Sequence, residues 1–191
     1  MIGAAVVACT LALAPGVDTP DSPAMVLERA SYHVRSTDVR ALAWIQAGAE
    51  GSPTFRELLN RLSTSDLIVY VQVVDRLNGA FGHLYFVTST ATVRYVRIEV
   101  VPIGNFAEMV ALVGHELQHA VEIAGAPQVR DRQTLAHFYL GMGENALSSG
   151  QYDSTEARVT EDRVKRELIG SSAYRSASAD RSRTHFKNQH E

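Results

Sequence analysis

The chain is poor in the residues that build several common kinds of site. Cys9 is the only cysteine among 191 residues, so neither an intrachain disulfide nor a cysteine-based zinc cluster can form. Lysine occurs only at Lys165 and Lys187, and every other side chain with a permanent positive charge is an arginine. The net charge is −3, from 18 basic and 21 acidic residues, which argues against a basic surface that binds nucleic acid. We therefore expect no nucleic-acid partner.

Long apolar runs are also missing, except at the N-terminus. Residues 2–15 are almost uncharged, and a run of about fourteen apolar residues is too short to span a bilayer but suits the core of a signal peptide. A small-x-small pattern at residues 12–14 offers a cleavage site, while residues 6–9 resemble a lipobox that would lipidate Cys9. We expect an exported protein with a leader and linker over residues 1–23. A truncated or misassigned start is the alternative.

The remaining composition is that of one globular domain, with 46% apolar and 20% charged residues. We place this domain at residues 24–170 and expect the Ser/Arg-rich tail, residues 171–191, to be disordered. Apolar periodicity, capping residues and β-branched runs predict helices at 37–51, 54–62, 105–124, 131–140 and 153–168, and strands at 67–74, 84–88 and 92–101. A D-x-x-E capping box would begin the last helix at Asp153, although Ser154 is an alternative first residue, and Thr54 with Glu57 would cap the helix at 54–62. Because short connections favour antiparallel pairing, the fold class is α+β with N-terminal helices and a small, mainly antiparallel sheet.

The chemistry-bearing motif lies in the helix at 105–124, which is otherwise almost entirely apolar. It reads His115-Glu116-Leu117-Gln118-His119, an HExxH pattern. Side chains four residues apart share one face of a helix, so the two imidazoles can occupy adjacent corners of a zinc tetrahedron. Glu116 reaches the same side and could deprotonate a metal-bound water. The motif predicts a Zn²⁺ site with Glu116 as the general base.

A less specific interpretation has no metal. In it, His115 and His119 are hydrogen-bonded core histidines, and Glu116 faces solvent. Burying two histidines and a glutamate without partners would cost several kcal/mol, which a metal offsets, so we favour the metal site. Glu122 lies on the same helix face as His115, seven residues on, and would orient a histidine from behind.

With this helix the chain resembles the zincin metallopeptidases, over roughly residues 37–168. Metzincins carry Gly and His three and six residues beyond the second histidine, where this chain has Glu122 and Gly125, and the GTxxxD segment of aspartate-ligand zincins is absent. The resemblance is therefore gluzincin-like and implies that a buried HExxH helix is followed by a C-terminal helix bearing a glutamate ligand. It assigns that third ligand to Glu156, with Glu144 and Glu161 as alternatives.

Peptide hydrolysis also needs a group that stabilises the oxyanion. His137, Tyr139 and Tyr152 are the candidates between the motif and the last helix, with packing or surface exposure as the plainer interpretation of each.

These features predict a zinc-dependent metallohydrolase, most simply a secreted or envelope peptidase that acts on peptides or proteins. One strand of the sheet would offer its edge to an extended substrate. The alternative function is a non-catalytic, zinc-stabilised binding or scaffold domain of the cell envelope. The sequence leaves the cleavage specificity, endopeptidase or exopeptidase action, and the oligomeric state open.

Overall fold

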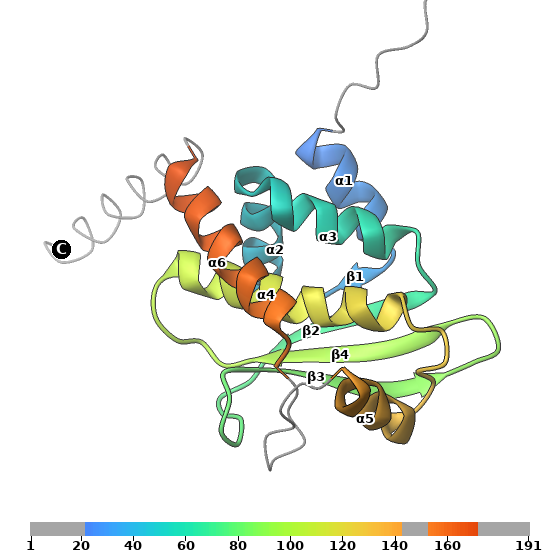
Figure 1. The fold of residues 1–191 in the computed structure, drawn as a ribbon. Helices are drawn as coiled ribbons and strands as arrows, with labels where there is room; N and C mark the ends of the chain where they lie inside the picture. The colour runs from blue at the N-terminus through green and yellow to red at the C-terminus, as the bar shows by residue number, and fades with distance from the viewer. Residues whose placement is uncertain (1–21, 143–152, 172–191) are drawn as a thin grey trace, which may run out of the picture.

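The computed structural model describes residues 22–142 and 153–171, which form six helices and one four-stranded sheet (Figure 1). The expectations for the leader, Cys9 and the tail beyond Ser171 concern residues outside these ranges. In chain order the elements are α1 (Pro23–Ala30), β1 (Val34–Arg35), α2 (Val39–Gly51), α3 (Pro53–Ser63), β2 (Leu67–Val73), β3 (Gly82–Ser89), β4 (Arg94–Val100), α4 (Phe106–Ala124), α5 (Arg132–Gly141) and α6 (Thr155–Gly170).

The sheet is mixed, with strand order β1-β2-β4-β3. β1 pairs with β2 and β2 with β4 in parallel, and only β3 and β4 pair antiparallel. The α+β class is confirmed, but the prediction of a mainly antiparallel sheet is wrong. The reason is that β3 does not pair with β2, which precedes it. The chain crosses to the outer edge to form β3 and then returns by a short turn, so that β4 fits between β2 and β3.

The helices cover one face of this sheet. Figure 1 shows α2, α3, α4 and α6 stacked above the strands, with α5 beside the outer strand β3. Helix α4 contacts β2, β3 and β4 on one side and α2, α3 and α6 on the other. Most of its side chains are accordingly buried, as its apolar composition predicts. The predicted buried HExxH helix is therefore the central element of the fold.

Both ends of α4 are fixed by polar contacts. At the first turn, Asn105 and Glu108 form the predicted capping box. At the other end, the guanidinium of Arg94 donates hydrogen bonds at 2.8 Å to the carbonyl of Ile123 in the last turn and to that of Ala126 just beyond the helix, and it forms a bidentate pair with Asp66. The final carbonyls of a helix have no hydrogen-bond donors within the helix, and this almost fully buried arginine provides donors for them.

At two helices a serine provides the cap, which moves the start of α3 from the predicted residue and decides between the two predicted starts of α6. Ser52, not Thr54, caps α3 and accepts a hydrogen bond from the Phe55 N–H at 3.0 Å. Ser154, not Asp153, caps α6, as the alternative start predicted, and accepts from the Ala157 N–H at 3.0 Å. Among the helices that the structure describes, none is both long and apolar enough to cross a membrane.

Candidate metal centre

The two histidines of α4 face each other through one nitrogen each. The Nε2 atoms of His115 and His119 lie 3.2 Å apart, and the side chains are 12% and 4% exposed. Two ligands at the corners of a tetrahedron, with metal–nitrogen bonds of about 2.0–2.1 Å, lie about 3.3 Å apart. The spacing of the two nitrogens therefore suits a shared metal ion.

The other nitrogen of each ring contacts a carboxylate. His115 Nδ1 lies 3.0 Å from Glu161 Oε2, and His119 Nδ1 lies 3.0 Å from Glu122 Oε2. A carboxylate there accepts an N–H, which places the proton on Nδ1 and leaves the lone pair on Nε2. With each proton on Nδ1, both Nε2 lone pairs point at the same small space. A cation there would relieve the repulsion, which is the arrangement expected of metal-ligating histidines.

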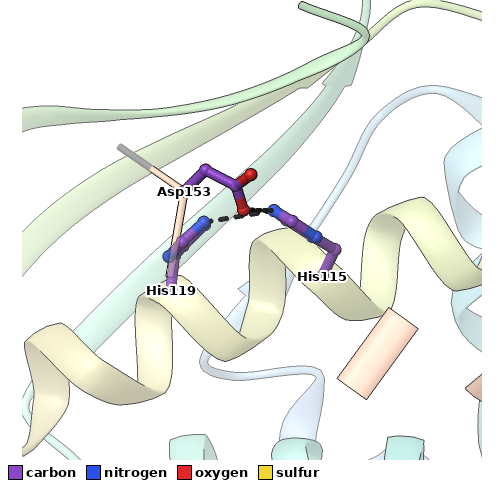
Figure 2. A group of neighbouring side chains, drawn as sticks. All are labelled: His115, His119 and Asp153. Carbon is purple, nitrogen blue, oxygen red and sulfur yellow. Dashed lines mark hydrogen bonds and ion pairs between the residues drawn. The ribbon is translucent and has the colours of Figure 1, made fainter. Parts of the chain in front are cut away.

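The third group in this space is the carboxylate of Asp153. Its Oδ1 lies 3.7 Å from His115 Nε2, and the three ligand atoms of His115, His119 and Asp153 all lie within 4.8 Å of one another. Figure 2 shows the Asp153 carboxylate pointing between the two imidazole rings. This His-His-Asp group could hold a metal ion, whose identity the geometry does not specify.

The structure brings Asp153 to this point rather than Glu156. Glu156 is exposed in the first turn of α6 and does not belong to the group. Ser154 explains the difference, because it caps α6, so that the Asp153 carboxylate does not, and Oδ1 of Asp153 faces the histidines while its Oδ2 accepts a hydrogen bond from Arg158 at 3.1 Å. The sequence contained a signal for this arrangement, because only one of the neighbours Asp153 and Ser154 can cap the helix. The side chain of the other is then available for a different contact. Of the alternatives, Glu161 lies behind His115, and Glu144 falls outside the described residues.

The surrounding charges set the protonation of the site. Burial lowers the pKa of His115, but the Glu161 hydrogen bond and the charges of Glu116, Glu161 and Asp153 outweigh burial and raise it above its usual value. Burial raises the pKa of Glu122, but hydrogen bonds from His119 and Ser154 outweigh it and lower the pKa below the ordinary range. Glu122 is therefore an anion that can hold the Nδ1 proton of His119.

Glu116 lies next to the group with nothing bonded to one of its oxygens. The residue is 4% exposed, and its Oε2 atom is buried without a hydrogen-bond partner among the described residues. Burial is the main cause that raises the pKa of this carboxyl, and the charges of His119 and His115 act in the opposite direction. The carboxylate packs against Gly82 on β3 so closely that a side chain there would overlap it. A buried carboxylate with a free oxygen and a raised pKa suits a general base.

These groups open into a cavity of about 540 Å³ between α4, α6 and the outer strand of the sheet. Residues 79–84, on β3 and the loop before it, form one wall. The other lining residues come mainly from the two helices and are Ile103, Glu108, Leu112, His115, Glu116, His119, Tyr139, Asp153, Glu161 and Lys165.

The remaining candidates occupy different places. The Tyr139 hydroxyl lies 3.1 Å from both His119 Nδ1 and Glu122 Oε2, so it supports the histidine on the side away from Nε2. Its position therefore favours an orienting role over oxyanion stabilisation. His137 is exposed on α5 and does not line the cavity, and Tyr152 lies outside the described residues.

Three members of this arrangement are not apparent from the sequence. Asp153, Ser154 and Gly82 all act through contacts between segments far apart in the chain. Ser154 caps α6 and also donates a hydrogen bond to Glu122 at 2.6 Å, which ties that helix to α4.

Comparisons of the chain with family models, with curated proteins and with solved structures find no match. The zincin resemblance therefore stays a prediction that rests on the HExxH pattern and on the geometry around it.

Proposed function

We propose that this protein is a zinc-dependent hydrolase that cleaves peptide bonds, with His115, His119 and Asp153 as the metal ligands and Glu116 as the general base. The observation that carries the proposal is the buried, unpartnered oxygen of Glu116 beside three converging ligand atoms in a cavity. Three protein ligands leave a tetrahedral position open, as catalytic zinc sites do, whereas structural sites usually have four protein ligands.

Each residue has a defined part in this chemistry. Zinc, when bound, supplies Lewis acidity that polarises a carbonyl and acidifies water. Glu116 takes a proton from the attacking water and delivers it to the leaving amine. Glu161 and Glu122 hold the Nδ1 protons of the two histidines and so keep both Nε2 atoms directed at the ligand space. The closed packing around His119 excludes water from one side of the site.

The edge of β3 supports a peptide as the substrate. The Val101 N–H donates to the Phe81 carbonyl at 2.7 Å, so Phe81 lies in a hydrogen-bonded pair with β4. Antiparallel strands alternate between hydrogen-bonded and non-bonded pairs, so the backbone groups of Gly82 and Leu84 point away from β4. Both residues line the cavity. An extended peptide could pair with this edge and place its backbone along the histidines.

Replacing the base tests the proposal. The chain is purified without chelators as the wild type, as Glu116→Gln, and as Glu57→Gln, a matched control at an exposed glutamate of α3. We expect about one zinc in each protein, with the cleavage of a peptide library lowered at least about 100-fold in Glu116→Gln alone. Bound zinc with undiminished cleavage in Glu116→Gln would remove Glu116 from its role.

The same experiment separates this function from a non-catalytic, zinc-stabilised scaffold. A scaffold would bind zinc and cleave nothing in all three proteins. A chain that binds no metal at all would contradict both functions.

A further inference from the structure

The face of the sheet that points away from α4 is open in the part of the chain that the structure describes. Along β4, buried residues alternate with half-buried ones, and β2 begins with the same alternation. Figure 1 places the helices that cover the sheet on one side of the strands, so the buried set points toward them and the other set forms the opposite face. None of the side chains of β2, β3 and β4 on that face is buried. We call it the outer face, and its central side chains are Tyr70, Gln72, His83, Tyr85, Arg97 and Glu99.

Cross-strand pairing arranges the centre of the outer face in two adjacent rows. The first row consists of Tyr70, Arg97 and Tyr85, and the second of Gln72, Glu99 and His83. The central members, Arg97 and Glu99, are two residues apart on β4 and therefore lie side by side on this face. One row thus has a positive centre and the other a negative centre.

The two central charges are held in place but are not satisfied within one chain. Arg97 Nε lies 2.8 Å from Glu99 Oε1, and the two side chains are 40% and 16% exposed. The guanidinium carbon of Arg97 lies 5.4 Å from the centre of the Tyr85 ring, which in turn lies 4.0 Å from the centre of the His83 ring. The Arg97–Glu99 contact is an ion pair without hydrogen-bond alignment, and neither residue makes a hydrogen bond to any other described residue. Donors and acceptors are therefore available to a partner.

The outer face has the composition of a protein–protein interface. Three of the seven tyrosines of the chain, Tyr70, Tyr85 and Tyr95, lie on it together with Arg97, and it carries no lysine among the described residues. Tyrosine and arginine are enriched in protein interfaces, and lysine is depleted there. The three hydroxyl groups make no hydrogen bond to described residues. The Glu99 carboxylate at the centre and the net charge of −3 disfavour a nucleic acid on this face.

We propose that the outer face is the interface of a homodimer, in which two copies of the chain stack their sheets face to face across a two-fold axis. The axis crosses the strands at the level of Ile98, between the two rows. The β4 strands of the two copies then run antiparallel over each other, so that Arg97 faces the partner's Glu99 and Glu99 faces the partner's Arg97. A second copy fits because this rotation exchanges the positive row and the negative row, which makes the face complementary to itself.

The rest of each row fits the same arrangement. The Tyr85 side chain would lie over the partner's His83, and the Tyr70 side chain over the partner's Gln72. Two aligned sheets pack about 10 Å apart, which leaves room for side chains of this length to interdigitate. Neither the metal nor the cleavage of peptides is needed for this dimer, so the dimer and the proposed peptidase can fail independently.

Exchanging the central charges between two copies tests the two-fold arrangement. Sedimentation equilibrium measures the dimer dissociation constant of the full chain as the wild type, as Arg97→Glu, as Glu99→Arg, and as an equimolar mixture of the two variants. Each variant alone sets like charges against each other twice, and we expect its dissociation constant to rise at least about 100-fold. In the mixed dimer every central charge faces an opposite one, so the mixture should dimerise within about tenfold of the wild type.

The mixture separates the interface from effects within one chain. Each chain in it still lacks its own Arg97–Glu99 pair, so recovery can come only from contacts between chains. Arg163→Glu, at an exposed position of α6 in the helix layer, is the control and should dimerise as the wild type does. A wild type that stays monomeric up to its solubility limit, or a mixture that dimerises no better than its components, would overturn the proposal.

A second pair of variants leaves the central ion pair intact. Gln72 is exposed, so a charge there does not disturb the core. It would face the partner's Tyr70, which lies between the partner's Arg35 and the partner's Arg97 in the cross-strand order. Gln72→Glu should therefore lower the dissociation constant, and Gln72→Arg should raise it, each by about tenfold. Equal effects of the two opposite charges would contradict the arrangement.

Discussion

The two histidines are held by carboxylates in very different surroundings. Glu122, behind His119, has a side chain that is only 8% exposed and accepts hydrogen bonds from Tyr139 and Ser154 as well as from the histidine. Glu161, behind His115, has a side chain that is 39% exposed. Both histidines line the cavity, but the support behind His119 is closed and tied to three segments of the chain, while the support behind His115 is open to solvent. The difference teaches that the His119 half is held more firmly than the His115 half.

The largest expected effect comes from removing Arg94, which anchors the end of α4 close to His119. Arg94→Met would leave Asp66 and the last carbonyls of α4 without their partner. The buried carbonyls of Ile123, Ala126 and Val129 would lose the donor that they share, and because each unsatisfied buried group costs about 1–3 kcal/mol, we expect a loss of about 3 kcal/mol or more in the free energy of unfolding. Denaturant unfolding of this variant is compared with Arg97→Met, on the outer face of the same strand, which should lose far less. Equal losses in the two variants would show that Arg94 is no special anchor of α4.

Asp153 joins the two halves, so its removal should have the next largest effect. Asp153→Asn takes away a ligand charge, and we expect zinc affinity to fall by more than the 10- to 100-fold typical of residues behind the ligands, that is, more than about 100-fold. Glu156→Gln, three residues further on, should leave the affinity unchanged. Competition with a fluorescent chelator measures both. The opposite order would return the third ligand to Glu156.

A substitution at Gly82 should lower the rate of peptide cleavage without changing zinc binding, which is the third effect in size. Gly82→Ala would push its new methyl group into the Glu116 carboxylate. A misplacement of about 1 Å in a catalytic group can cost about 100-fold in rate, and we expect a loss of that order in peptide cleavage with zinc binding intact. Gly141→Ala is the control, because a methyl group there meets nothing within 4 Å. Full cleavage by Gly82→Ala would mean that the position of Glu116 does not depend on this contact.

Replacing Glu122 and Glu161 in turn by glutamine tests whether the two halves of the site differ in how firmly they hold their histidines. Glu122→Gln should weaken zinc binding by about 10- to 100-fold, because a buried amide cannot replace an anion that accepts hydrogen bonds from four donors, namely Gln118, His119, Tyr139 and Ser154. Glu161→Gln should weaken it by less than about tenfold, because water can reach the exposed position and hydrogen-bond His115. Both affinities come from the same chelator competition. Equal losses would remove the distinction between the two halves.

The smallest effect concerns pH and the anchor of α4. The hydrogen bond from Arg94 is the main cause that holds the pKa of the Asp66 carboxyl below its usual range. A lowered folded-state pKa stabilises the protein above the unfolded-state value of about 3.9, and this stability is lost as the pH falls through the folded-state pKa. Because Asp66 is partly exposed, we expect at most about 1 kcal/mol. Acid unfolding should therefore show wild type and Asp66→Asn converging below pH 4, and a constant difference would contradict this origin.

The sequence predicted the local elements well, because periodicity and caps are local signals. The helix that carries the motif begins and ends within a residue of the predicted bounds, and the Asn105 capping box is present. What it could not predict depends on contacts between distant segments. The place of β3 at the outer edge, the buried contacts of Arg94 and the approach of Asp153 to α4 all depend on how the chain folds back. Asp153 and Glu156 both lie near the start of α6, and the sequence does not show which carboxylate reaches the histidines. Asp153 does so because Ser154 is the residue that caps the helix.

The central claim is that His115, His119 and Asp153 hold one metal ion beside Glu116. Metal analysis of the full chain purified without chelators, combined with X-ray absorption spectroscopy at the zinc edge, tests it most directly. We predict about one zinc per chain, with two imidazole nitrogens at about 2.0–2.1 Å and the remaining ligands oxygen. In Asp153→Asn, the zinc content should fall. A chain without tightly bound metal, or zinc retained unchanged in the absence of the Asp153 carboxylate, would contradict the account.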